Sequence, residues 1–300
     1  MKKITALIIL IVLLFIGFIF LSNKNTGNTD NSAYSGKLKV AASFLPVADL
    51  VRQVGGEKID VVQILPSGSS PHTYEPIAKD QENLLNTKLA FVIGYELDSW
   101  ADAMLNAAAP HARVVVLDKN ISLENVKNSD STSIDPHYWL SYTNAQAMVQ
   151  TINTELAEMN PENKAYFQSN ADAYIVKLNT AKTLALAKIQ PLAHKQIITF
   201  HEAFNYFAKE LGLEVVTSIE EFPGQEPSPQ YLANVGELIK KYNVKTLFKE
   251  PELSDSIILA LAKDYGANVA TLDPEGGLEN TSNFLDMMNY NVDTIVKALN

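Results

Sequence analysis

Four side chains of this 300-residue chain combine metal-binding chemistry with positions in short connecting loops. His72 and His137 each stand beside a proline, which restricts the backbone and the direction of the side chain. His201 directly follows an apolar run, and Asp273 follows another and precedes a proline. Three neutral imidazoles and one carboxylate are a donor set suited to zinc. Their spacing matches no local zinc motif, so ordinary hydrogen-bonded histidines are the alternative.

The absence of cysteine narrows the chemistry that the chain can perform. It excludes disulfides, thiolate zinc sites, iron–sulfur clusters and cysteine nucleophiles. A bound metal ion must therefore be held by nitrogen and oxygen atoms. The two other histidines, His111 and His194, lie in segments upstream of expected strands, and we expect both to be solvated.

Composition excludes further classes of protein. Hydrophobic residues make up 47% of the chain and charged residues 19%, so the chain can bury a core and is not disordered. Its formal net charge is −10 at pH 7. Because an acidic protein repels phosphate backbones, no nucleic acid is expected as a partner.

The N-terminus predicts an association with a membrane. Residues 1–21 begin with two lysines and continue as an uncharged apolar run, which at about 1.5 Å per residue approaches the ~30 Å thickness of a bilayer core. The run ends without the small residues of a cleavage site, so we expect an uncleaved anchor, with a cleaved signal as the alternative. The polar residues 22–36 predict a flexible tether. The rest of the chain is expected on the extracytoplasmic face of the cell membrane, or secreted or periplasmic after cleavage.

The elements that must position the four side chains alternate along the chain. Continuous apolar runs such as Leu89–Ile93 and Arg113–Leu117 predict strands covered on both faces, as in a parallel sheet. Helical patterns lie between the runs, so the chain is built of βα units. The expected strands are 37–43, 59–65, 89–93, 113–117, 196–200, 213–218, 246–249 and 268–272.

A long helix is expected in the middle of the chain. Apolar residues from Phe167 to Ile189 recur at helical spacing, and a proline stands at the first helical position. We therefore expect an α/β fold with two Rossmann-like βα lobes, residues 37–160 and 192–300, joined by one long backbone helix over 161–191. An ordinary crossover helix within one sheet is the alternative. Since parallel sheets bind ligands at the carboxyl ends of their strands, the metal site is expected in the interlobe cleft.

Six motifs carry a resemblance to a known family. In chain order they read VAASFLPVADLVRQVGG, LPSGSSPHTYEP, DPHYWLS, ITFHEAFNYFAKELGL, EPSPQYLANVGELIKKYNVKTLFKEPELS and VATLDPEGG. With them the chain resembles the metal-binding solute receptors (substrate-binding proteins) of zinc and manganese ABC transporters, the cluster A-I family. The resemblance spans Lys37–Asn300 and implies two βα lobes bridged by one long helix. It also implies that His72, His137, His201 and Asp273 hold a metal ion between the lobes.

The third ligand indicates which metal this is. Manganese receptors of the family usually carry a glutamate where this chain has His201, and nitrogen-rich sites favour zinc. We therefore expect Zn2+ as the transported ligand, with Mn2+ as the alternative. The chain departs from the family in two respects: the segment Asn125–Ile134 is short and has no histidine, and the lipid-anchoring cysteine is absent.

The resemblance implies a monomeric receptor that captures the ion and delivers it to the permease of an ABC importer, and not an enzyme. We expect affinity to fall below about pH 6 as the imidazoles are protonated. Three rivals stay open. A zinc-dependent hydrolase needs a general base such as Glu202 or Asp135. A receptor for an organic ligand needs an aromatic pocket around Trp100 and Trp139, and an adhesin needs only surface display.

Overall fold

The computed structural model describes residues 37–128, 131–220 and 224–300. The expected anchor 1–21 and tether 22–36 lie outside the described residues and stay predictions. Leu38–Asn300 form one compact unit. None of the helices in the described part of the chain combines the length and the apolar character that a membrane span requires.

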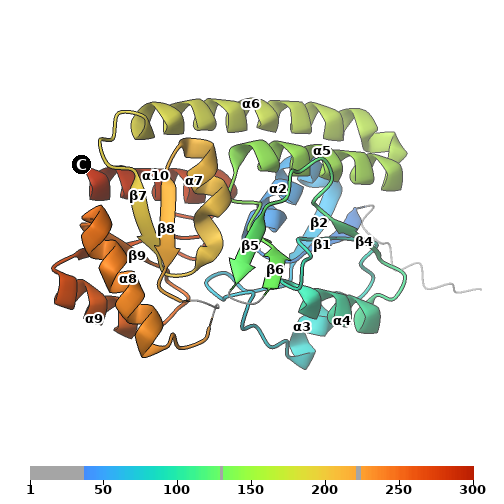
Figure 1. The fold of residues 1–300 in the computed structure, drawn as a ribbon. Coiled ribbons are helices and arrows are strands. Elements are labelled where there is room, and N and C mark those ends of the chain that lie inside the picture. Colours follow the sequence, from blue (N-terminus) through green and yellow to red (C-terminus); the bar gives the residue numbers. More distant parts are fainter. Residues whose placement is uncertain (1–36, 129–130, 221–223) are drawn as a thin grey trace, which may run out of the picture. The chain divides into compact units, whose positions relative to one another are not determined.

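The first of two parallel four-stranded sheets has the strand order β2-β1-β3-β4. Its strands are β1 (Leu38–Ala42), β2 (Ile59–Gln63), β3 (Leu89–Val92) and β4 (Arg113–Val116). Its helices are α2 (Leu45–Gly55), α3 (Ala78–Glu82), α4 (Ser99–Ala108) and α5 (Tyr142–Met159), and a 3-10 turn, Gly56–Lys58, follows α2. We call this part the first lobe (Figure 1).

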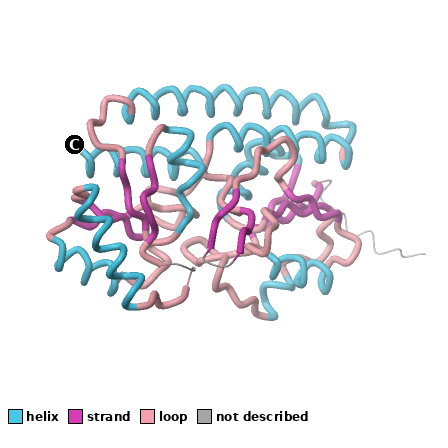
Figure 2. Tube along the Cα trace, in the orientation of Figure 1, coloured by secondary structure: helices cyan, strands magenta, loops and turns pink. Residues whose placement is uncertain are grey.

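The second sheet has the strand order β10-β9-β7-β8 and is also parallel. Its strands are β7 (Gln196–Thr199), β8 (Glu214–Ser218), β9 (Thr246–Lys249) and β10 (Asn268–Thr271). Its helices are α7 (Asn205–Leu211), α8 (Pro229–Tyr242), α9 (Ser256–Tyr265) and α10 (Phe284–Leu299), and a 3-10 turn, Glu202–Phe204, precedes α7. We call this part the second lobe, and the tube in Figure 2 shows its strands separate from those of the first.

Helix α6 (Lys164–Ile189) joins the two lobes and runs alongside both of them in Figure 1. It is 26 residues long and follows a 3-10 turn, Pro161–Asn163, so the regular helix begins three residues later than the proline indicates. The apolar positions that predict the helix form its buried face. The buried residues are Phe167, Ala171, Tyr174, Leu178, Ala181, Ala185 and Ile189. The α/β fold with two βα lobes and one long helix is therefore confirmed, while the exact lobe boundaries stay predictions.

The largest hydrophobic core is continuous between the lobes. It includes residues of β1, α2 and α5 from the first lobe, of α7 and α10 from the second, and the inner face of α6. Two smaller clusters lie within single lobes, one around α8 and α9 and one around α4. Because apolar packing is dense and resists deformation, this shared core limits how far the lobes can move apart.

One expectation about the first lobe needs correction. Strand β4 is not covered on both faces: it is the edge strand of its sheet, and Val114 and Val116 are 40% and 39% exposed. An apolar run cannot show its place in the sheet, because strand order depends on the rest of the chain. The sequence also predicts no strands in a polar stretch after β4, where β5 (Asn125–Asn128) and β6 (Ser131–Ile134) pair as antiparallel strands. Its polar residues give no strand signal.

Candidate metal centre

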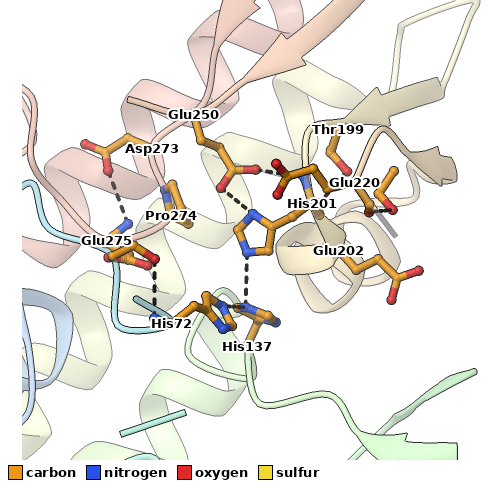
Figure 3. A network of polar contacts seen from close by, with 12 residues as sticks. His72, His137, Thr199, His201, Glu202, Glu220, Glu250, Asp273, Pro274 and Glu275 are labelled. Carbon is orange, nitrogen blue, oxygen red and sulfur yellow. Dashed lines mark hydrogen bonds and ion pairs between the residues drawn. The ribbon is translucent and has the colours of Figure 1, made fainter. Parts of the chain in front are cut away.

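Three of the four candidate ligands meet between the lobes. The Nε2 atom of His137 lies 3.1 Å from Nε2 of His72 and 3.3 Å from Nε2 of His201. In the described part of the chain, these three form the one group of three or more histidine or acidic side chains whose ligand atoms all lie within 4.8 Å of one another. Nitrogen ligands of a tetrahedral zinc ion stand about 3.3 Å apart. Figure 3 shows the three rings facing a common point.

The loops that carry the histidines are short and fixed. His72 follows Pro71, whose carbonyl oxygen accepts a 3.0 Å hydrogen bond from the indole of Trp100. The indole of Trp139, two residues after His137, donates to the carbonyl oxygen of Pro274 in the second lobe at 2.8 Å. Trp139 is fully buried. Both tryptophans therefore support loops of the site, and Trp139 cannot line an open aromatic pocket for an organic ligand.

Carboxylates orient two of the three rings. Asp135 Oδ1 accepts from the backbone N–H of His137 at 2.9 Å and lies 2.8 Å from its Nδ1. Nδ1 of His201 lies 2.5 Å from Glu250 Oε2, a contact that is an ion pair when the ring is protonated. A carboxylate at Nδ1 keeps the proton on that nitrogen, so Nε2 presents its lone pair to the centre of the cluster.

Burial and neighbouring charges give the three histidine rings different pKa values. Burial, together with the neighbouring His137 and His201, lowers the pKa of His72 to about 2. Burial also lowers the pKa of His137, and the opposing effect of Asp135 is smaller. Burial lowers the pKa of His201 as well, but the negative charge of Glu250 beside Nδ1, together with nearby glutamates, outweighs burial and raises that pKa above its usual value. His201 is therefore the most basic ring of the cluster.

Asp273 is not part of this group. Its Oδ1 accepts from the backbone N–H groups of Glu275 and Gly276 at 3.1 and 2.7 Å. Its Oδ2 accepts from Gly277 at 3.0 Å, Leu278 at 3.3 Å and the hydroxyl of Thr281 at 2.5 Å. The carboxylate thus stabilises the turn that follows β10. The structure places Asp273 at the expected strand end but does not bring it together with the histidines, and its role as a ligand stays a prediction.

Glu275, which sequence reasoning missed, is a second carboxylate of this turn, and it is buried. It is 5% exposed, and its Oε2 has no hydrogen-bond partner among the residues that the structure describes. Burial, and then the charges of Glu252, Glu250 and Asp273, raise its pKa well above the usual value. In the view of Figure 3 it lies between Asp273 and His72. Its position two residues after a strand-end aspartate and before two glycines is the signal that could have identified it.

The remaining candidates have other environments. His111 and His194 are exposed, as expected. Asp135, one candidate general base of a hydrolase, is fully buried. Its Oδ1 contacts Nδ1 of His137, and its Oδ2 accepts a hydrogen bond from the amide of Asn205. Because both oxygens of Asp135 accept hydrogen bonds, it is not free to activate a water molecule. Glu202 lines a cavity next to Asp135 rather than joining the three histidines.

Comparison with known proteins shows the same architecture in metal-binding proteins. The family described as zinc-uptake complex component A, periplasmic (ZnuA), matches residues 40–298. The high-affinity zinc uptake system protein ZnuA of Bacillus subtilis is 30% identical over 301 residues, covering 94% of both chains. The manganese-binding lipoprotein MntA of Halalkalibacterium halodurans is 26% identical, covering 91% of this chain and 92% of its own.

A solved structure extends the similarity to three dimensions. The laminin-binding protein Lmb of Streptococcus agalactiae, described as bifunctional with adhesin and metal-transporting activity, superposes with a TM-score of 0.79. It is 29% identical, and the match covers 88% of this chain and all of Lmb. The chain thus shares its fold with proteins that are described as binding metal ions, and its relatives in sequence include a zinc uptake protein and a manganese-binding protein.

Proposed function

The chain belongs to the ZnuA family, and from this premise we propose that it is the metal-binding receptor of an ABC importer. It captures a divalent metal ion on the extracytoplasmic side and delivers it to a membrane permease. The observation that carries the proposal is the convergence of His72, His137 and His201 from two lobes onto one point. Relatives that match over nearly their whole length are described as a zinc uptake system protein and as ABC transporter substrate-binding lipoproteins, which supports a function without catalysis.

Zinc is the ion that the donor set favours. The three Nε2 atoms are neutral nitrogen donors, and such sites prefer zinc to manganese, which favours oxygen. Two of the rings are held by Asp135 and Glu250, so the site is organised before the ion arrives. The relatives include both a zinc and a manganese protein, so manganese is the second candidate.

A carboxylate is expected to complete the coordination of the ion. The sequence favours Asp273, but its oxygens accept four backbone N–H groups and one hydroxyl. Glu275 is buried in the same turn with an oxygen that has no partner among the described residues, and the neighbouring Glu250 contacts His201. Metal binding removes the cost of burying this carboxyl group without a partner. We therefore propose that Glu275 supplies the oxygen ligand and that Asp273 shapes the turn.

The N-terminal segment bears on where the protein acts. Relatives in streptococci are described as lipoproteins, whereas this chain has no cysteine to carry a lipid. We propose that residues 1–21 serve as the anchor instead and that the receptor works as a monomer. Tethering keeps the captured ion close to the permease.

Metal analysis of the natively purified protein tests the function. We expect one zinc ion per chain, and calorimetry should show tighter binding of zinc than of manganese. Alanine at His137 or His201 should weaken zinc binding by orders of magnitude, because each removes a nitrogen ligand. H194A, which changes an exposed histidine, is the matched control and should bind as the wild type does. Unchanged affinity in both H137A and H201A would refute the site.

A further inference from the structure

Helix α7 belongs to the second lobe by sequence, yet its polar side chains reach the first lobe. The ammonium group of Lys209 lies 2.6 Å from Glu124 Oε1. The carboxylate of Glu210 accepts from the backbone N–H groups of Tyr142 and Thr143, at the start of α5, at 2.6 and 2.9 Å. These contacts attach α7 firmly to the lobe that carries His72 and His137.

One of these contacts leads directly to a ligand of the proposed metal site. The amide of Asn205 donates a 3.1 Å hydrogen bond to Asp135 Oδ2, while Asp135 Oδ1 holds His137. The hydroxyl of the next residue, Tyr206, donates to the backbone oxygen of Asp135 at 3.1 Å. Asp135 is fully buried, and both of its carboxylate oxygens accept hydrogen bonds. Its side chain is therefore held in one orientation. The direction of the His137 ring therefore depends on Asn205.

We propose that Asn205 is a positioning residue for metal binding: acting through Asp135, it fixes the imidazole of His137. The proposal rests on the proposed function of the histidine cluster. His201 lies four residues before Asn205 and opens the turn that leads into α7. The same short segment thus supplies a ligand from the second lobe and supports a ligand of the first. A displacement of α7 disturbs two of the three histidines together.

The surroundings of the contact set the size of the expected effect. Asp135 and Asn205 line a cavity of about 480 Å³ together with Glu124, Glu202 and Lys209. Water in this cavity can replace part of a lost hydrogen bond to Asp135. Loss of a group that orients a metal ligand weakens metal binding by about 10- to 100-fold. Because water can replace the Asn205 amide beside Asp135, we expect N205A to weaken binding by about tenfold.

A double-mutant cycle on the full-length chain tests the proposal. Zinc affinity is measured by competition with a chromophoric chelator for the wild type, N205A, D135A and the double variant. If Asn205 acts through Asp135, N205A weakens binding about tenfold in the wild type and has no further effect beside D135A. K209A changes the same helix and cavity without touching Asp135, and its affinity should stay within about twofold of the wild type. Equal losses from N205A with and without D135A would overturn the proposal.

A spectroscopic measurement covers the case in which D135A does not fold. The Nδ1 proton of His137 that faces Asp135 is observed by nuclear magnetic resonance in the metal-free protein. N205A should shift this resonance or broaden it by exchange with water, and K209A should leave it in place. An unshifted resonance in N205A contradicts the proposal. A wild type that binds neither zinc nor manganese would refute the proposed function instead, and the resonance would still decide whether Asn205 positions His137.

Discussion

His201 and His72 face the same point but hold protons very differently. Burial and the two neighbouring imidazoles disfavour the protonated form of His72 and lower its pKa to about 2. His201 has Glu250 against its Nδ1, and the pKa of His201 is raised. Metal ions and protons compete for the same lone pairs, so His201 is the ring at which this competition occurs near neutral pH.

We expect zinc binding at pH 6.5 to release protons from His201, and E250Q to reduce the number released. Because the pKa of His201 lies above 6.5, more than half of this ring is protonated there before the metal binds. Removing the charge of Glu250 lowers that pKa, so fewer protons remain to be displaced. Calorimetry in buffers of different ionisation enthalpy measures the number. E237Q, on the surface of α8, is the control, and equal proton release in E250Q and E237Q would contradict the assignment.

The two carboxylates of the turn after β10 should respond differently to neutral substitutions. E275Q should weaken zinc binding at least tenfold and leave the metal-free fold intact, because it replaces a buried carboxyl group whose Oε2 has no hydrogen-bond partner in the described part of the chain. D273N should lower the free energy of unfolding by about 1–3 kcal/mol, because an amide nitrogen cannot accept from the backbone N–H groups of the turn. Calorimetry and urea unfolding separate the two effects. The reverse pattern would identify Asp273 as the ligand.

At the scale of elements, Asp49 connects three helices that are distant in sequence. It lies on α2, and its Oδ2 accepts from the backbone N–H of Phe284, the first residue of α10, at 3.0 Å. The hydroxyl of Tyr174 on α6 lies 3.4 Å from the same oxygen. The start of α10 is therefore held by a helix of the first lobe. This polar contact within the apolar core fixes how the helices fit together.

We expect D49A to destabilise the protein by about 1–3 kcal/mol, because it leaves the buried N–H of Phe284 without a partner. Urea unfolding of the metal-free protein measures the change. D172A, which changes an exposed residue on α6, should stay within about 0.5 kcal/mol of the wild type. Equal free energies of unfolding for D49A and D172A would show that the contact between α2 and α10 does not contribute to stability.

For the whole molecule, closure of the lobes depends on an unusually close approach of two glycines. A Cβ atom at Gly277, in the turn after Asp273, would lie 2.6 Å from the Cα atom of Gly68 in the loop that precedes His72. Both partners are backbone, so no side chain can move aside. The continuous core under α6 holds the other side of the lobes together, and this contact therefore defines how closely the loops around the metal site meet.

We expect G277A to separate the loop of His72 from the turn of Glu275 and to speed zinc dissociation by about tenfold, equivalent to ~1.4 kcal/mol. Stopped-flow chelation measures the rate. G68A is the comparison: its Cβ would lie 3.9 Å from Gly277, so it strains its own backbone at a φ of 79° without a clash between the loops. A dissociation rate in G277A no faster than in G68A would show that the glycine contact does not control closure.

Local patterns in the sequence determined the α/β alternation, the long helix and the placement of three histidines after strands, because helical spacing and turn residues act over a few neighbours. The tertiary structure decided the rest. The oxygens of Asp273 accept the N–H groups of their own turn, whereas Oε2 of Glu275 finds no hydrogen-bond partner within the described ranges. Likewise, β4 became an edge strand, and Asn205 met Asp135, 70 residues earlier in the chain. Each of these outcomes depends on which distant groups compete for the same hydrogen bond or the same place in a sheet, and that competition exists only in the folded chain.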